Sequence, residues 1–207
     1  TYVTHGDTAL ALAQILSEQG ARRIRFVESQ GVALPLEDVV AAAGWDVRAL
    51  QAIGAVEFEN TRNLGFGSQY ARLPVPDGGR LFSYLDVNHS YAETDVLVSL
   101  CKMKEHATAA GITLSMKNLF GVMPGIYYGW PKNVLHHAGI ENSILDINAT
   151  LKPHFAIVDR IDDRALAGPV RLGRIDAIGD ERADDLLLAV EGRGGQHRHP
   201  MRIDAGG

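Results

Sequence analysis

The sequence predicts an α/β domain with a mostly parallel sheet and flanking helices in three layers. Helical and strand patterns alternate along most of the chain, as in βα-type folds. The chain opens with a helix and a strand joined by a tight turn at Gly20, and Thr94–Leu100 is almost continuously apolar, which is typical of a strand buried on both faces. We place the domain at residues 1–162. Residues 163–207 are expected to be a poorly specified, mobile C-terminal tail, which would leave the fold incomplete.

The first elements follow from hydrophobic spacing and turn residues. Apolar side chains recur at helical spacing over residues 8–19, with Asp7 as the expected N-cap and Gly20 at the end. Residues 22–27 alternate charged and apolar side chains, which predicts a short strand. The next predicted elements are a helix over 36–43, a strand over 55–59, a long connection over 60–79 and strands over 81–87 and 94–100.

The second half continues the alternation. We expect a helix over 111–121, an ordered loop over 122–133 held by aromatic packing, and a helix over 140–151. Residues 155–159 predict another buried strand, which ends in the carboxylate of Asp159. Residues 186–190 are the one short element expected in the tail.

Composition narrows the classes of function. The formal net charge is −5 and the sequence pI is about 5.9, which is not the basic footprint of a nucleic-acid-binding domain. No apolar run approaches the roughly 20 residues that span a bilayer, and the first residues lack the basic and apolar regions of an export signal. We therefore expect a soluble protein without nucleic-acid or membrane partners. Its compartment is left open, because the sequence begins at Thr1 without a Met.

A single cysteine limits the cofactors. Cys101 by itself excludes an internal disulfide and any iron–sulfur cluster ligated by cysteines of this chain alone. Its apolar surroundings favour a buried thiol over a nucleophile. The cofactor is otherwise unknown.

The most informative polar residues directly follow the apolar run that ends at Leu100. Lys102, Lys104 and His106 fall on one face if the chain stays extended, so two ammonium groups and an imidazole would converge on an anion. Ligands of open α/β sheets bind at the carboxyl ends of strands, where these residues are expected. The alternative is a solvated strand end.

Two further residues lie in the next apolar segment. Lys117 has an ordinary explanation, because a lysine near the end of a helix is favoured by the helix dipole. Asn118 does not, because asparagine is a poor helix-interior residue and often bonds backbone or ligand.

Histidines and carboxylates offer weaker candidates. His136 and His137, together with His5, His89, His106 and His154, raise the possibility of a metal, but no His-x-His or His-x-x-x-His pair with a carboxylate partner occurs in the core, and we predict no metal ligands. Asp146, Asn148 and Asp159 fit a general base, a metal ligand or a cap, with Asp159 the best placed, at a strand end. Phosphate-binding loops of the known glycine-rich types are absent.

Several motifs together resemble the family called domain of unknown function 362. They are Lys102–His106, Gly111–Thr113, Lys117–Gly121, Pro124–Gly125, Tyr128–Lys132, Leu135–His137, Ile144–Asn148 and Ala156–Asp159. The match covers about 95–159 well and 4–28 loosely. Members of that family are often joined to ferredoxin-like iron–sulfur modules, and some carry export signals, which implies redox chemistry or a redox partner. This sequence departs from the family at Glu105, where threonine is usual, and lacks the expected signature after Gly168–Pro169.

Two hypotheses follow, and the sequence does not decide whether the protein is an enzyme. In the first, the chain binds a small anionic substrate or cofactor in redox-related metabolism, with His106, Lys104 and Asp159 as catalytic residues. The ligand would be held by Lys102, Lys117, Asn118, Trp130, Lys132 and His136. In the second, the chain is a non-catalytic module whose aromatic loop, residues 127–130, together with the lysines docks an iron–sulfur partner of the ferredoxin type.

Overall fold

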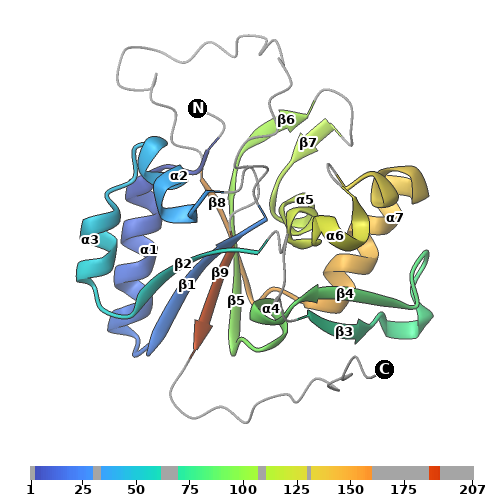
Figure 1. The fold of residues 1–207 in the computed structure, drawn as a ribbon, viewed down its shortest axis with the longest axis horizontal. Coiled ribbons are helices and arrows are strands. Elements are labelled where there is room, and N and C mark those ends of the chain that lie inside the picture. The colour runs from blue at the N-terminus through green and yellow to red at the C-terminus, as the bar shows by residue number, and fades with distance from the viewer. Residues whose placement is uncertain are drawn as a thin grey trace.

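The computed structural model describes residues 3–29, 34–61, 70–106, 111–129, 132–159 and 187–191, and it confirms the α/β fold (Figure 1). Its main sheet has five strands in the order β2-β1-β9-β5-β8. β1 (Arg23–Glu28) is parallel to β2 (Val56–Asn60), and β5 (Val96–Lys102) is parallel to β8 (Phe155–Asp159). β9 (Leu187–Glu191) runs antiparallel between β1 and β5. The other four strands therefore all point in one direction.

Three helices pack on one face of the sheet. They are α1 (Gly6–Glu18), α2 (Leu36–Ala42) and α3 (Val47–Ala52). The core beneath them centres on Phe26, whose ring stacks on Phe58 and meets Trp45 edge-on, both with ring centroids 5.4 Å away. The predicted helices are confirmed as α1 and α2, although the cap of α1 is His5 rather than Asp7, because the His5 ring accepts from the Asp7 N–H.

The second hydrophobic core lies on the opposite face of the sheet. It packs under a hairpin of β3 (Tyr70–Pro74) and β4 (Tyr84–Asn88), whose turn contains the short 3-10 helix η1 (Pro76–Gly78). The helices on this side are α4 (His89–Ala92), α5 (Ser115–Asn118), η2 (Leu119–Val122), α6 (Gly125–Tyr128) and α7 (Asn133–Leu151). Leu119, Met123 and Leu135 are fully buried here, so the segment after β5 supplies much of this core.

Several sequence expectations are corrected. Residues 60–79, which we expected to be a connection, contain the strand β3. Its pattern did not predict a strand, because the alternation is short and ends in Pro74. The expected helix over 111–121 begins as β7 (Gly111–Thr113), paired with β6 (Lys104–His106), and only Ser115–Asn118 is α-helical. The last predicted helix starts earlier, at Asn133, and contains a non-helical residue at Gly139.

β8 forms where the sequence predicts a strand, but it is not buried. It lies at one edge of the sheet, and Phe155, Ala156 and Val158 are exposed. An apolar run does not distinguish an edge strand from a central one, because both have the same side-chain pattern until their neighbours are known.

The short element expected near the end of the chain is β9, which lies inside the sheet rather than beyond it. Residues 160–186 and 192–207 lie outside the described residues, so the division at residue 162 stays a prediction. Within the described part of the chain, no helix is long and apolar enough to cross a membrane.

Candidate functional site

The carboxyl edge of the sheet holds a buried ion pair between two predicted site residues. Lys102 ends β5, Asp159 ends β8, and the lysine Nζ lies 3.2 Å from Asp159 Oδ2. The same carboxylate accepts the His5 backbone N–H at 2.7 Å and the Thr8 hydroxyl at 3.3 Å. Asp159 therefore joins two strand ends to the N-terminus of α1, where a negative charge is stabilised by the helix dipole. Its role as a general base stays a prediction.

A second lysine reaches the same edge from the segment before α7. Lys132 adopts the left-handed conformation, with φ of 66°, and its Nζ donates to Ser29 Oγ at 3.3 Å, just beyond the end of β1. Val27 of β1 and Ser99 of β5 both pair with Leu187 of β9. Ser29 and Cys101, each two residues further along, therefore lie at the same height along the strand direction. With one strand between them, β1 and β5 are roughly 10 Å apart. Lys102 and Lys132 are only 7% and 5% exposed.

Three residues that the sequence predicts to bind a ligand are connected through the ring of Phe120, which lies between Lys117 and His136. Lys117 Nζ lies 4.0 Å from the centre of the Phe120 ring, and that ring meets His136 edge-on at 4.8 Å. His136 Nδ1 lies 3.0 Å from the Lys132 carbonyl oxygen, which can only accept, so Nδ1 carries the hydrogen. In the neutral ring this leaves Nε2 as the acceptor. Lys117, His136 and Lys132 are thus brought together through Phe120.

The Asn118 side chain binds a neighbouring strand of the protein. Its side-chain Nδ2 donates to Ser99 Oγ at 3.0 Å, and the Ser99 hydroxyl donates to the Ser115 carbonyl at 3.3 Å. This fixes α5 against β5. The unusual placement of an asparagine before Leu119 and Phe120 is explained in part by this contact.

The predicted face of Lys102, Lys104 and His106 is interrupted. β5 ends at Lys102, and β6 begins again at Lys104 after Met103, so one continuous strand does not carry all three residues. Lys104 is half-buried. The side chain of His106 and the whole of Trp130 lie outside the described residues.

The remaining carboxylate and amide candidates bind backbone. Asp146 accepts the N–H groups of Arg80, Leu81 and Phe82 at 2.8, 2.8 and 3.1 Å, which holds the β3–β4 turn against α7. Asn148 donates to the carbonyls of Met116 and Ile144. Both residues therefore act as anchors between elements.

The histidines whose side chains the structure describes do not gather around a common centre. His89 lies beside Glu93, the His154 ring accepts the Leu97 N–H, and His5 caps α1. Among the described residues, no group of three or more histidine, cysteine or acidic side chains is placed to hold a metal. Cys101 is buried, as expected.

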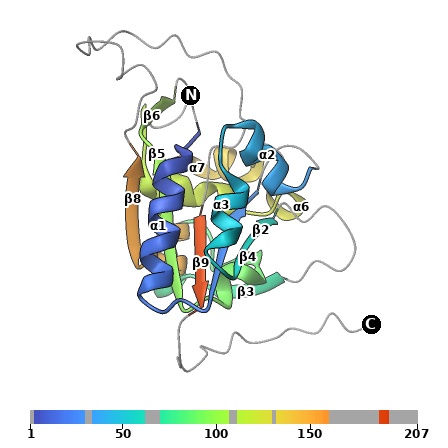
Figure 2. The same cartoon turned by 90° about the vertical axis from the view of Figure 1, so that its left-hand side faces the viewer.

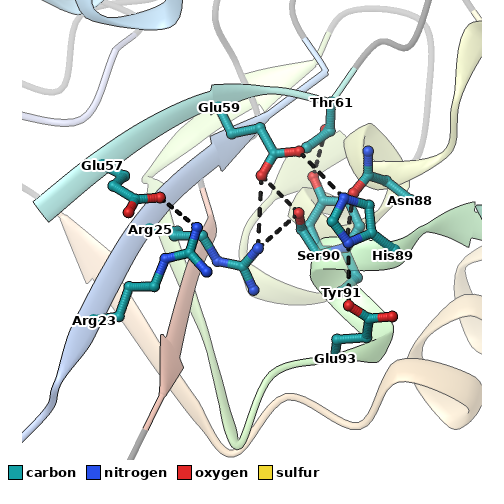
Figure 3. A network of polar contacts seen from close by, with 10 residues as sticks. All are labelled: Arg23, Arg25, Glu57, Glu59, Thr61, Asn88, His89, Ser90, Tyr91 and Glu93. Atoms are coloured by element: carbon teal, nitrogen blue, oxygen red, sulfur yellow. Dashed lines mark hydrogen bonds and ion pairs between the residues drawn. The ribbon is translucent and has the colours of Figure 1, made fainter. Parts of the chain in front are cut away.

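Sequence reasoning missed a polar network on the sheet face opposite α1 (Figure 3). Arg25 of β1 donates to Ser90 Oγ at 3.1 Å, and Ser90 donates to Glu59 of β2 at 2.6 Å. His89 Nε2 lies 4.0 Å from the other oxygen of Glu59. The available signal was the spacing of two arginines and two glutamates, Arg23, Arg25, Glu57 and Glu59, on neighbouring strands. The network neutralises a buried arginine inside the sheet.

Comparison with known proteins identifies the family. The chain matches the family model described as Domain of unknown function (DUF362) over residues 1–174. The Thylakoid-associated protein sll1697 of Synechocystis sp. is 27% identical over 202 residues, which cover 90% of this chain and 52% of that protein. The chain thus spans about half the length of this curated relative. No solved structure matches it significantly. Because the family model covers most of the chain, the protein belongs to the DUF362 family.

Proposed function

We propose that this chain binds a small anionic substrate or cofactor at the carboxyl edge of its sheet, in redox-related metabolism. The observation that carries the proposal is the burial of two lysines, Lys102 and Lys132, at that one edge. An ammonium group is costly to remove from water, so its burial requires compensating partners and is often functional. Ligands of open α/β sheets bind at this edge.

The contacts suggest different roles for the two lysines. Lys102 is held by Asp159, so its charge is already offset and it serves mainly to fix the strand ends. Lys132 donates to the Ser29 hydroxyl at the same edge, and we assign its ammonium group, with its positive field, to hold the anion. Lys104 and Lys117 would add to that field from β6 and α5, and Asn118 and Trp130 would line the ligand.

Proton transfer is assigned to histidine. Nε2 of His136 is the acceptor nitrogen of its neutral ring, because Nδ1 bonds the Lys132 carbonyl. His106 remains the alternative proposed from its position at the end of β6. The redox setting rests on the family resemblance, since members are often joined to ferredoxin-like modules.

A thermal-shift screen tests the proposal. The wild-type chain, Lys104→Ala and Lys132→Met would each be heated with inorganic phosphate and with phosphorylated and carboxylated metabolites. We expect at least one anion to raise the melting temperature of the wild type, and both variants to reduce that shift. An unchanged shift in both variants, or no shift with any anion, would remove the proposed site.

One surface favours the second function, a docking module for an iron–sulfur partner. The outer face of the β3–β4 hairpin carries Tyr70, which meets Tyr127 edge-on at 4.8 Å, and Arg72, which lies 3.9 Å from the centre of the Tyr84 ring. Tyr84 and Tyr127 are exposed. Exposed aromatic residues with arginine are common at the centres of protein interfaces.

A pulldown with a ferredoxin-like protein as bait separates the two functions. Docking through this surface predicts that Tyr127→Ala weakens capture, whereas Lys132→Met leaves it unchanged. Capture that survives both Tyr127→Ala and disruption of Trp130 would count against the docking module.

A further inference from the structure

The ion pair between Lys102 and Asp159 lies on the face of the sheet that α1 covers. Side chains two positions apart on a strand share a face. Lys102 follows Leu100 at that spacing and Asp159 follows Ile157, and both apolar residues pack in or against the core under α1. The Thr8 hydroxyl of α1 reaches Asp159 from the same side. Figure 2 looks at the sheet from this side, with α1 in front of the strands.

The second buried lysine, Lys132, lies on the opposite face, which carries α7. Its Nζ donates to Ser29 Oγ at 3.3 Å, and Ser29 stands two positions after Val27, which belongs to the core on the α7 side. Lys117 and His136 both contact an aromatic ring of that same core. A ligand held by Lys132, Lys117 and His136 would therefore bind on the α7 face, behind the strands in Figure 2.

The hydrogen bonding of His136 limits what this ligand can be. Nδ1 of its ring lies 3.0 Å from the Lys132 carbonyl oxygen, which also accepts the backbone N–H groups of Leu135 and His136. A carbonyl cannot donate, so Nδ1 holds the ring hydrogen and Nε2 of the neutral ring has only a lone pair. The ring is half-buried and meets Phe120 edge-on, which restricts its rotation. A polar group that binds Nε2 must therefore bring a hydrogen of its own.

We propose that the ligand of this site is an anion that carries a hydroxyl beside its charged oxygens, and that His136 selects it. The inference rests on the proposed function, because it requires an anion at this edge. The lysines contact the charged oxygens, and the hydroxyl donates to Nε2 of His136. Hydrogen phosphate and 2-hydroxy carboxylates share this chemistry.

Sulfate and simple carboxylates lack the hydroxyl and serve as the excluded class. Their oxygens only accept hydrogen bonds, so one of them would face the lone pair of Nε2 without a hydrogen between them. A site built to bind a hydroxyl discriminates strongly against an analogue that lacks it. His136 is thus a specificity-determining residue, whereas Lys132 holds any anion.

Two matched pairs of anions test the selection by calorimetric titration in weakly alkaline solution. Hydrogen phosphate and sulfate are then dianions of similar size, and only hydrogen phosphate has a hydrogen to donate. Glycolate and acetate differ in the same way. We expect the hydroxyl-bearing member of at least one pair to bind at least about tenfold tighter than its partner. The pair that shows the preference tells phosphates from hydroxy acids.

Two variants separate selection from anion binding. His136→Gln should bring the ratio of affinities within the pair close to one, because an amide can turn either its donor or its acceptor to the ligand. Lys132→Met should weaken both members of the pair by the same factor. A ratio that His136→Gln leaves unchanged would overturn the role of His136, even where Lys132→Met weakens binding as expected.

The state of the ring is measured independently by long-range hydrogen–nitrogen correlation spectra, in which the His136 signals are those missing from His136→Gln. We expect the hydrogen of the neutral ring on Nδ1, and a shift of the Nε2 resonance when the preferred anion is added. A hydrogen on Nε2, or equal affinities within both pairs, would overturn the inference and leave the anion site standing. A chain that binds other anions in the thermal-shift screen but none of these four would do the same, whereas a chain that binds no anion would remove both.

Discussion

Lys102 Nζ lies 3.2 Å from Asp159 Oδ2, and the two side chains are only 9% and 1% exposed. The pair joins the ends of neighbouring parallel strands, and Asp159 also receives the His5 N–H at the start of α1. Removing one member of a buried pair leaves an uncompensated charge, which costs far more than loss of a surface pair. The stability of this edge of the sheet therefore depends on Asp159.

Asp159→Asn should lower the free energy of unfolding by about 3 kcal/mol, because Lys102 would lose its buried counter-charge. Urea denaturation followed by circular dichroism measures this. Glu57→Gln is a matched control, because it makes the same chemical change in the exposed pair with Arg23 and should cost less than about 1 kcal/mol. Equal losses in the two variants would contradict the account of Asp159.

The turn of the β3–β4 hairpin offers a matched pair of glycines. Gly78 and Gly79 have φ of 80° and 68°, so alanine is strained at both, by roughly 1–2 kcal/mol. Only at Gly79 would the added Cβ collide with a backbone atom, the Phe82 carbonyl oxygen. Gly79→Ala should therefore have a clearly lower urea midpoint than Gly78→Ala. Similar midpoints would show that the turn relaxes freely despite its anchoring by Asp146.

The buried phenol of Tyr128 should make the folded protein less stable in alkaline solution. Burial raises the pKa of its phenol from 10.0 to about 12, while the hydrogen bond from the Asp86 N–H acts in the opposite direction. The unfolded chain thus releases this proton first as the pH rises. The stabilisation is complete below pH 10 and is lost as the pH rises through about 12.

Urea midpoints measured across that interval check the prediction by comparing variants. Tyr128→Phe should show a smaller fall in stability than the wild type, since it has no buried phenol to ionise. Tyr127→Phe changes an exposed neighbour and should behave as the wild type does. A wild-type profile that coincides with that of Tyr128→Phe would disprove the assignment.

Local patterns were sufficient to predict much of the fold. Alternation over 22–27 and helical spacing over 8–19 correspond to β1 and α1, although β1 is buried on both faces, its charged Arg25 included. β8 was located correctly, but its exposure was not, because the sequence does not state which strand lies at an edge. The position of β9 between β1 and β5 depends on long-range pairing, which no local pattern encodes.

The sequence predicted where the candidate site lies, but not which of its residues contact each other. The rule that ligands gather at strand ends placed Lys102 and Asp159 at one edge of the sheet, and they are in contact there. Their direct pairing was not expected, because it requires β5 and β8 to be neighbours in register. Asp146 was considered for chemistry, but it binds three backbone N–H groups of a turn that lies 64 to 66 residues away in sequence.

The most direct test of anion binding at this edge is calorimetric titration with the anion that gives the largest thermal shift. Lys132→Met should weaken binding at least about tenfold, the loss expected for one charge-assisted hydrogen bond. Lys152→Met is the control, because Lys152 is also left-handed, with φ of 46°, but is exposed at the far end of α7. Weakened binding in Lys132→Met alone supports the site. Equal affinity in all three proteins would contradict it.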